Sequence, residues 1–272
     1  MKTAVVILCG GESRRMGRPK ALLPWRGTSI ISYIVERFRA LVDEVLVVSS
    51  SSLTLPVLSS AEIVIDEDDH QGPLAGIARG LEAMEADFAF VIATDMPFVS
   101  RQFVDILLSR EIPVAMELGG VVQTLAAVYP KEGATVARSL LRSGRARPYD
   151  LLKKMGAEIM KETDLTFNPG LDGMNTPEDY LEAISKDDPD AKATVEFFGR
   201  TRLLTGMRLQ TLPVSTLGKL LELAAPDIRW IENDILGREF LISLNGGEFV
   251  RNVHMPVGPE ESVIVLDAPA GG

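Results

Sequence analysis

Short apolar runs alternate with amphipathic segments over residues 1–185, and this alternation constrains the fold more than any other feature of the sequence. Four runs rich in β-branched residues have the composition of buried parallel strands, in which both faces are covered: Thr3–Leu8, Glu44–Ser49, Ile63–Ile65 and Phe88–Ala93. Helical stretches lie between and after them, at Ser29–Leu41, Leu74–Met84 and Gln102–Ser109. The pattern predicts an α/β domain with a mostly parallel sheet and right-handed crossovers.

The pattern becomes mixed after residue 120. Leu125–Tyr129 is typical of a strand, and three further helices are predicted at Thr135–Leu141, Tyr149–Met155 and Thr176–Ile184. The last of these opens with Asn175-Thr176-Pro177-Glu178, which supplies a capping side chain, a proline in the first turn and acids near the positive end of the helix dipole.

The composition changes again near residue 187. Ser185–Ala191 is charged, contains a proline and lacks apolar periodicity, which is typical of an exposed linker. Strands are then predicted at Ala193–Phe198, Met207–Leu212, Glu239–Leu244, Glu248–Val250 and Ser262–Leu266, with one helix at Thr216–Ala225. We therefore predict a first domain over 1–186, a linker over 187–191 and a small α+β domain over 192–272.

Charge and cysteine content narrow the classes of function. Lys and Arg total 28 while Asp and Glu total 38, so the net charge of −10 disfavours general binding to nucleic acid or to anionic membranes. The single cysteine, Cys9, excludes a disulfide framework and a cysteine-based zinc site. No run approaches the ~18 apolar residues of a membrane span, and Ala4–Leu8 is too short for a signal-peptide core. We expect a soluble cytoplasmic protein.

A glycine-rich segment follows the first strand, with the sequence Leu8-Cys9-Gly10-Gly11-Glu12-Ser13-Arg14-Arg15-Met16-Gly17-Arg18-Pro19-Lys20. Glycines let a backbone turn sharply and approach an anion, and the second half holds four cations and no acid: Arg14, Arg15, Arg18 and Lys20. Five residues separate Gly11 from Gly17 where a Walker loop has four, and the dinucleotide fingerprint G-x-G-x-x-G is absent. The segment indicates either a polyphosphate site of another type or a surface turn with solvated arginines.

The pattern Gly10-Gly11-x-Ser13-x-Arg15-Met16-Gly17-x-x-Lys20 resembles the signature of the nucleoside-triphosphate transferases that include molybdopterin guanylyltransferase. Gly72-Pro73-Leu74-Ala75-Gly76 resembles the second glycine loop of that family, which contacts the nucleotide. Thr94-Asp95-Met96-Pro97-Phe98 resembles its metal-binding Asp-x-Pro segment, and Asn175-Thr176-Pro177-Glu178-Asp179 its late motif. Gln123–Tyr129 resembles the strand that faces the acceptor. The resemblance implies a Rossmann-like domain that transfers GMP from GTP to molybdopterin and releases pyrophosphate.

Roles follow from the resemblance for each matching residue. It implies that Arg15 and Lys20 hold the triphosphate, that Asp95 binds Mg²⁺, and that the nucleotide is contacted by Leu8, Gly10, Gly11, Lys20, Gly72, Leu74, Gly76 and Asp95. The family carries Asn or Asp two positions before the Asn-Thr-Pro motif, where this chain has Gly173, so the second metal ligand is either Asn175 or Asp172, which precedes Gly173.

Some of these residues could instead have a purely structural role. Asp95 could cap a helix that begins near Ser100, and Asn175 could serve in a helix cap alone. The clusters Arg142/Arg145/Arg147 and Asp66/Glu67/Asp68/Asp69 are expected on solvated surface, and His70 and His254 lack metal-ligand spacing.

The C-terminal segment resembles a second family. Ala193–Phe198 followed by Gly199-Arg200-x-Arg202, the helix Thr216–Ala225, Leu244-Asn245-Gly246 and the final Gly271-Gly272 are similar to the small sulfur-carrier subunit of molybdopterin synthase. That resemblance implies a ubiquitin-like β-grasp domain whose terminal glycine is adenylated and converted to a thiocarboxylate. Its implied partners are the large subunit of molybdopterin synthase and an adenylating, E1-like activating enzyme.

Other functions stay open at this point. The first domain could be a cytidylyltransferase or a sugar-1-phosphate nucleotidyltransferase, or the chain could be a carrier or regulatory protein without catalysis. The glycine tail could be a protein modifier or a plain terminus, and the linker could be cut or intact.

Overall fold

The computed structural model describes residues 1–10, 15–66 and 72–268. Gly11, Arg14, residues 67–71 and the terminal Gly271 and Gly272 therefore lie outside the described part of the chain. The chain forms two compact units, one of Met1–Glu12 with Ile30–Gly173 and one of Ser13–Ser29 with Met174–Gly272. No helix within the described ranges is both long and apolar enough to cross a membrane.

The first unit is built on a seven-stranded sheet. In spatial order its strands are β5 (Glu62–Asp66), β4 (Glu44–Ser50), β1 (Thr3–Cys9), β6 (Phe88–Ala93), β8 (Val121–Pro130), β7 (Val114–Leu118) and β9 (Glu158–Lys161). The first four are parallel, whereas β8 runs antiparallel to both β6 and β7, and β9 is parallel to β7. The predicted α/β class with a mostly parallel sheet is confirmed.

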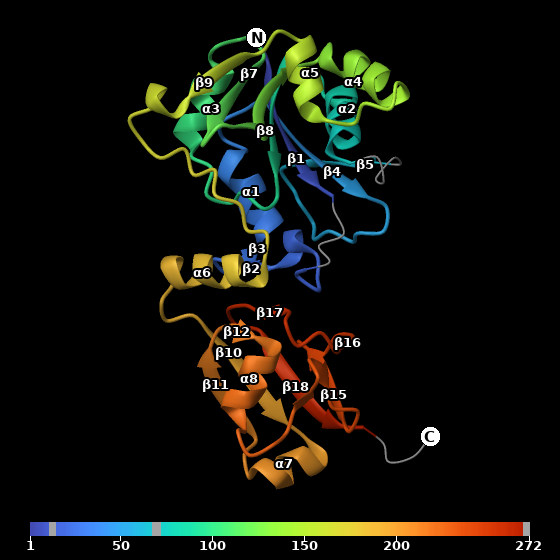
Figure 1. Cartoon of the computed structure of the whole chain (residues 1–272), viewed down its shortest axis with the longest axis vertical. Helices are drawn as coiled ribbons and strands as arrows, with labels where there is room; N and C mark the ends of the chain where they lie inside the picture. Colours follow the sequence, from blue (N-terminus) through green and yellow to red (C-terminus); the bar gives the residue numbers. More distant parts are fainter. Residues whose placement is uncertain (11–14, 67–71, 269–272) are drawn as a thin grey trace. The chain divides into compact units, whose positions relative to one another are not determined.

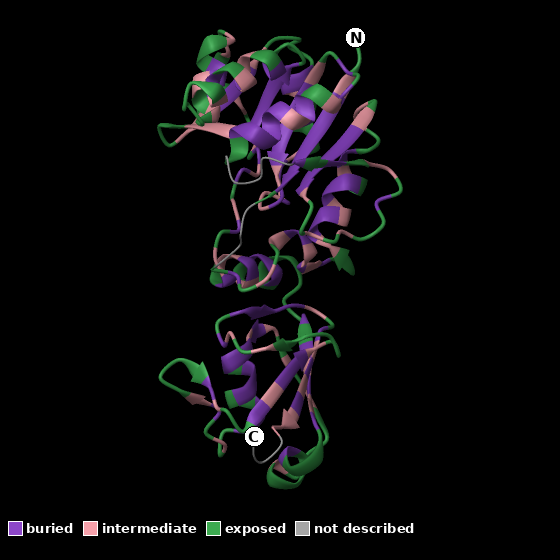
Figure 2. Cartoon of the chain, turned by 90° about the vertical axis from the view of Figure 1, so that its right-hand side faces the viewer, coloured by how far each residue is buried: buried purple, intermediate pink, exposed green. Residues whose placement is uncertain are grey.

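Helices cover both faces of this sheet (Figure 1), namely α1 (Ile30–Phe38), α2 (Pro73–Ala83), α3 (Arg101–Leu108), α4 (Gly133–Arg142) and α5 (Pro148–Lys154). Side chains alternate along β1: Val6 and Leu8 join one core cluster with residues of α2, α4 and α5. On α3, the Phe103 ring meets Phe90 of β6 edge to face, with centroids 6.1 Å apart. The strands are the most deeply buried part of the unit (Figure 2).

Helix α2 lies unusually close to the sheet because of Gly80. A Cβ at this position would collide with the side chain of Val6 and lie 3.2 Å from Val48 Cγ2. The glycine thus lets the helix backbone rest directly on β1 and β4, which fixes the first turn of α2 beside the ends of those strands.

Four elements of the second unit lie between the two sequence segments of the first unit or directly after them. They are a 3₁₀ helix (η1, Lys20–Leu22), the short pair β2 (Pro24–Trp25) and β3 (Thr28–Ser29), and helix α6 (Pro177–Asp187). The predicted start of α6 is confirmed as a capping box: Asp179 N–H donates to Thr176 Oγ1 at 3.1 Å, and the Asp179 carboxylate accepts the Thr176 N–H at 2.8 Å.

The rest of this unit is a five-stranded sheet with the helices α7 (Gly199–Thr205) and α8 (Leu217–Ala224). Its order is β11 (Leu209–Pro213), β10 (Lys192–Phe197), β18 (Ser262–Asp267), β15 (Phe240–Leu244) and β16 (Phe249–Val250). The central strands β10 and β18 are parallel, and the other neighbours are antiparallel. Helix α8 (Leu217–Ala224) contributes to the core, where Trp230 stacks on Phe197 and donates its indole N–H to the Ala225 carbonyl at 2.9 Å.

Several elements were not predicted. They are α7 (Gly199–Thr205), η3 (Glu162–Asp164), the strands β7 and β9, and the two-residue pairs β12 (Ser215–Thr216) with β17 (Pro256–Val257) and β13 (Ile231–Glu232) with β14 (Ile235–Leu236). The expectation that every strand of the first sheet is covered on both faces is wrong for β5, because Ile63 and Ile65 are 43% and 39% exposed. This strand lies at the edge of the sheet, where one face stays open to solvent.

Candidate active site

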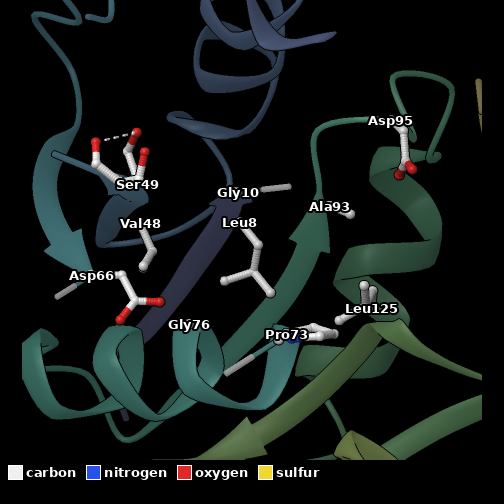
Figure 3. A pocket seen from close by; sticks show the side chains of 12 residues that line it. Leu8, Gly10, Val48, Ser49, Asp66, Pro73, Gly76, Ala93, Asp95 and Leu125 are labelled. Atoms are coloured by element: carbon white, nitrogen blue, oxygen red, sulfur yellow. Dashed lines mark hydrogen bonds between the residues drawn. The ribbon is translucent and has the colours of Figure 1, made fainter. Parts of the chain in front are cut away.

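A pocket of about 300 Å³ lies at the carboxyl ends of β1, β4, β5 and β6 in the first unit (Figure 3). Open α/β sheets bind ligands at this edge, and the volume is at the lower end of the range for small-molecule sites. The strands and the first turn of α2 supply most of the lining residues: Leu8, Gly10, Val48, Ser49, Ser50, Asp66, Gly72, Pro73, Gly76, Ala93, Asp95 and Leu125.

The fold brings together in this pocket most of the first-unit residues that were expected to contact the nucleotide. Gly10, Gly72 and Gly76 line this pocket together with Leu8 and Asp95, although these residues come from widely separated parts of the sequence. Leu74 is different: its side chain is fully buried in the core beneath α2 and does not line the pocket. Gly11 lies outside the described residues.

Close packing shapes the wall of the pocket at Gly76. A Cβ there would crowd Leu8 Cδ2 at 3.3 Å and would lie in van der Waals contact with Asp66 Oδ2 at 3.7 Å. Gly72 has a φ of +78° and is the residue before the first turn of α2, a conformation that glycine adopts without strain. The N-terminus of α2, next to Gly72, carries the positive end of the helix dipole, whereas the Asp66 carboxylate gives its part of the lining a negative charge.

Asp66 is the pocket residue that sequence reasoning missed. Its acidic neighbours predicted solvated surface, but the structure gives it only 8% exposure, so that prediction is wrong. Asp66 ends strand β5, as Asp95 follows strand β6, and Figure 3 shows the two carboxylates on opposite sides of the Leu8 side chain. Its place at the carboxyl end of a predicted strand was the signal that could have identified it.

Asp95 does not cap the following helix. Ser100 precedes α3, and its hydroxyl accepts the Phe103 N–H at 3.4 Å, so the structural alternative for Asp95 is wrong. The half-buried Asp95 carboxylate instead lines the pocket directly after β6. Carboxylate oxygen is the donor that Mg²⁺ prefers, and Mg²⁺ is commonly held by one or two carboxylates together with substrate phosphates. Asp95 therefore fits a Mg²⁺ ligand, while the described residues contain no group of three or more His, Cys, Asp or Glu placed to hold a metal.

The second unit brings together Lys20 and Asn175. The Lys20 Nζ donates to Asn175 Oδ1 at 3.2 Å, and the Asn175 N–H in turn donates to the Asp179 carboxylate at 2.8 Å. This backbone bond is the largest cause that holds the pKa of Asp179 below its ordinary value. Asp172 belongs to the first unit, whereas Asn175 belongs to the second.

The other cations of the loop have different surroundings. Arg15 is exposed. Arg18 forms two hydrogen bonds of 2.8 Å with Glu261, so the expectation that it counts among unopposed cations for a polyphosphate is wrong. The acid that neutralises it lies 243 residues away in the sequence. Arg142, Arg145 and Arg147 are largely exposed, which confirms the prediction for that cluster.

Comparisons with known proteins place the first part of the chain. The family model described as "MobA-like NTP transferase domain" matches residues 5–159. A protein of Bacillus cereus named "Probable molybdenum cofactor guanylyltransferase" is 32% identical over 191 residues, which covers 67% of this chain and 96% of that protein. The protein of the same name from Bacillus anthracis is 31% identical with the same coverage.

Solved structures agree at the level of the fold. Molybdopterin-guanine dinucleotide biosynthesis protein A from Archaeoglobus fulgidus superposes with a TM-score of 0.57 at 22% identity, covering 68% of this chain and 99% of that one. The 2-C-methyl-D-erythritol 4-phosphate cytidylyltransferase from Thermus thermophilus gives a TM-score of 0.53 at 21% identity, covering 68% of this chain and 98% of that one. The first part of the chain thus has the Rossmann-like nucleotidyltransferase fold, which by itself does not select the nucleobase.

Proposed function

This chain belongs to the family of MobA-like NTP transferases, and we propose that it transfers GMP from GTP to the phosphate of molybdopterin, with release of pyrophosphate. The named relatives support the acceptor and the nucleotide, and the pocket at the end of the sheet supports binding of a nucleotide's base and ribose. The observation that carries the choice of base is the buried Asp66 carboxylate in the pocket wall.

Asp66 favours guanine for a chemical reason. The Watson–Crick edge of guanine presents the N1–H and the N2 amino group, two adjacent donors that a carboxylate accepts together. Cytosine presents the acceptors N3 and O2 at the corresponding positions, and a carboxylate would repel them. A carboxylate in the pocket wall therefore favours the base that presents two donors over the base that presents two acceptors.

The reaction needs no nucleophile from the protein. An oxygen of the acceptor phosphate attacks the α-phosphorus of GTP, a new P–O bond forms, and the bond between the α-phosphorus and the bridging oxygen breaks as pyrophosphate leaves. The protein contributes positioning and charge. In this proposal Gly10 and Gly11 let the backbone approach the nucleotide, while Arg15 and Lys20 bind the triphosphate and offset the charge on the leaving group.

Asp95 is the residue proposed to hold Mg²⁺, with Asn175 or Asp172 as the second contact. The metal, when bound, would neutralise charge on the phosphate oxygens. The hydrogen bond from Lys20 to Asn175 Oδ1 supports a role for Asn175 in orienting the lysine, which is compatible with either choice of second contact.

Pyrophosphate release from each of the four NTPs, measured with Mg²⁺ and molybdopterin, tests the proposal. We expect turnover with GTP and a preference over CTP on the order of 10⁴. Asp66→Asn should lower kcat/KM for GTP by about 10- to 100-fold, because an amide accepts only one of the two donors well. Glu62→Gln is the matched control, since Glu62 lies exposed on the same strand.

The competing cytidylyltransferase hypothesis gives the opposite result in the same assay. A rate with CTP that equals or exceeds the rate with GTP would refute guanylyl transfer. Release of pyrophosphate with none of the four NTPs would favour the hypothesis of a carrier or regulatory protein without catalysis.

We also propose that residues 192–272 form a ubiquitin-like β-grasp sulfur carrier. The sheet supports this proposal: two central parallel strands, β10 and β18, are flanked by antiparallel β11 on one side and by the β15–β16 pair on the other. Helix α8 connects the first two strands to the rest and packs on the sheet. A helix between a first hairpin and a returning parallel strand is the arrangement expected of a β-grasp domain.

The chemistry of this second role takes place at Gly272. An activating enzyme would join the Gly272 carboxylate to AMP from ATP with release of pyrophosphate, and a sulfur donor would then displace AMP to leave a thiocarboxylate. That group would supply sulfur in a complex with the large subunit of molybdopterin synthase. A side chain at Gly271 or Gly272 would crowd the approach of the activating enzyme to the carboxylate.

Intact mass spectrometry tests the carrier role on the full chain isolated with its activating enzyme, ATP and a sulfur source. The role requires a free carboxylate on Gly272 and predicts exchange of one oxygen for sulfur, which deletion of Gly271 and Gly272 abolishes. Isopeptide adducts on other proteins would instead support a protein modifier, and neither product with a competent activating enzyme would refute the carrier assignment.

A further inference from the structure

The second half of the glycine-rich loop lies directly on the segment that contains Asn252 and Met255. Residues 15–29 cluster with residues 174–272 in one compact unit. Met16 is fully buried, and Gly17 has a φ of +69°. A Cβ on Gly17 would collide with the side-chain amide of Asn252 and lie 3.2 Å from Met255 Cβ. The contact therefore leaves no room for a side chain at Gly17.

A buried ion pair joins the next residue to the same part of the chain. Arg18 Nη1 and Nη2 donate to Glu261 Oε2 and Oε1 at 2.8 Å each. The Arg18 side chain is 15% exposed and the Glu261 side chain 4%. A bidentate pair of this kind is specific in geometry, and its loss leaves an uncompensated charge in a desolvated place.

The C-terminal part of the chain is built to hold Glu261 in this position. Glu261 Oε2 accepts the Gly258 N–H at 2.8 Å, and Oε1 accepts the Asn245 side-chain amide at 3.2 Å. Asn245 is itself fixed, because its Oδ1 accepts the Ser262 N–H at 2.8 Å. Both carboxylate oxygens are thus placed by backbone and side-chain donors from around β18 before they meet Arg18.

Lys20 lies between this ion pair and a second anchor. Two residues after Arg18, Lys20 begins the 3₁₀ helix η1, and its Nζ reaches Asn175. Further along the segment, the Tyr180 hydroxyl donates to the Pro24 carbonyl at 2.6 Å, and a Cβ on Gly258 would lie 3.1 Å from Pro24 Cγ. The segment from Arg18 to Pro24 is therefore fastened at both ends, to α6 and to the loop before β18.

From these contacts we infer that the C-terminal part of the chain is a docking surface for its own glycine-rich loop, and that Glu261 is a positioning residue for Lys20. Arg18 serves this contact rather than the triphosphate. The catalytic consequence rests on the proposed function, in which Lys20 binds the triphosphate, whereas the docking of the loop does not depend on it.

Hydrogen–deuterium exchange of the full-length protein tests the docking directly. We expect Glu261→Gln to speed exchange in residues 15–25 by about tenfold or more, because a local contact that restrains this segment is lost. Asp267→Asn is the matched control: Asp267 is a carboxylate at the end of β18, the strand that Glu261 directly precedes, and it accepts the N–H of Arg200 in α7. This control should leave exchange in residues 15–25 at the wild-type level.

A double-mutant cycle separates a specific contact from general destabilisation. Arg18→Gln should speed exchange in the same segment. The double variant Arg18→Gln/Glu261→Gln should be less perturbed than Glu261→Gln alone, because no charge is then left buried without a partner. Arg18→Gln leaves Glu261 bonded to Gly258 and Asn245, so it tests the contact even where Glu261→Gln does not fold.

The rate of pyrophosphate release, measured as a function of GTP concentration, gives the functional readout. We expect the KM for GTP to rise about tenfold or more in the single variants, with a smaller effect on kcat. Wild-type exchange in residues 15–25 of a folded Arg18→Gln protein would overturn the inference. If exchange is faster in the variants but the wild-type protein does not bind GTP, the docking surface stands and the proposed function is refuted instead.

Discussion

We expect removal of the Lys20 amine to lower turnover strongly while it leaves the free energy of unfolding almost unchanged. The Lys20 Nζ donates a hydrogen bond of 3.2 Å to the side chain of the exposed Asn175. A partly exposed contact of this type contributes less than about 1 kcal/mol to folding. Lys20→Ala should therefore leave the free energy of unfolding nearly unchanged.

The expected effect on turnover is much larger. Loss of one preorganised charge contact to a group that develops charge in the transition state lowers kcat by a factor on the order of 10²–10³, which corresponds to about 2.7–4 kcal/mol. Lys20→Arg keeps the charge but changes the geometry of the donors, so it should recover only part of the activity.

Steady-state release of pyrophosphate from GTP measures this effect, alongside thermal denaturation of each variant. Lys186→Ala is a suitable control, because Lys186 is an exposed lysine of α6 in the same unit, paired with Glu182 at 2.6 Å. Turnover of Lys20→Ala close to that of the wild type would refute the triphosphate role. A large loss of stability in the same variant would show that the lysine has a structural role that the contacts do not indicate.

Three further predictions follow from single contacts. Asp95→Asn should remove most Mg²⁺-dependent turnover and leave the far-UV circular dichroism spectrum unchanged, since Ser100 rather than Asp95 caps α3; unfolding with a normal metal response would contradict this. Gly80→Ala should lower the free energy of unfolding by about 1–3 kcal/mol in denaturant titrations, because the new methyl group collides with Val6; an unchanged midpoint would show that α2 can move away from the sheet. Asp179→Ala should cost about 1 kcal/mol near neutral pH through the lost capping box. Since the folded-state pKa of Asp179 is lowered, that difference should be present above the ordinary pKa of the carboxyl and shrink as the pH falls through the lowered value, and a difference independent of pH would contradict the assignment.

The sequence determined the elements whose signal is local. Continuous apolar runs predicted β1, β4 and β6, because a strand buried on both faces has few positions that tolerate a polar side chain. The run Ile63–Ile65 also predicted β5, although one face of that strand is partly exposed. The cap of α6 was equally local, since Thr176, Pro177 and Asp179 lie within one turn. The strands β7 and β9 escaped prediction because their short runs are set by pairing with β8 and with each other, which no local pattern records.

The site was determined by sequence only where a residue sits at the end of a predictable strand or in a glycine turn. Gly10, Gly72, Gly76 and Asp95 were placed in this way, and the structure brings all four to one pocket. Asp66 has the same kind of position, but its acidic neighbours suggested solvent, and only the packing of β5 beside Gly76 of α2 buries its carboxylate.

Tertiary structure alone decided that one cation of the loop pairs with an acid of the protein itself. The sequence shows four positive side chains without a nearby acid, yet Glu261 lies 243 residues further along the chain and neutralises Arg18 through two hydrogen bonds. Charge acts through space and not along the sequence, and in a desolvated place its strength depends on a separation of a few ångströms. The local pattern thus determined that this loop is cationic, and only the fold determined which of its cations is committed to the protein itself.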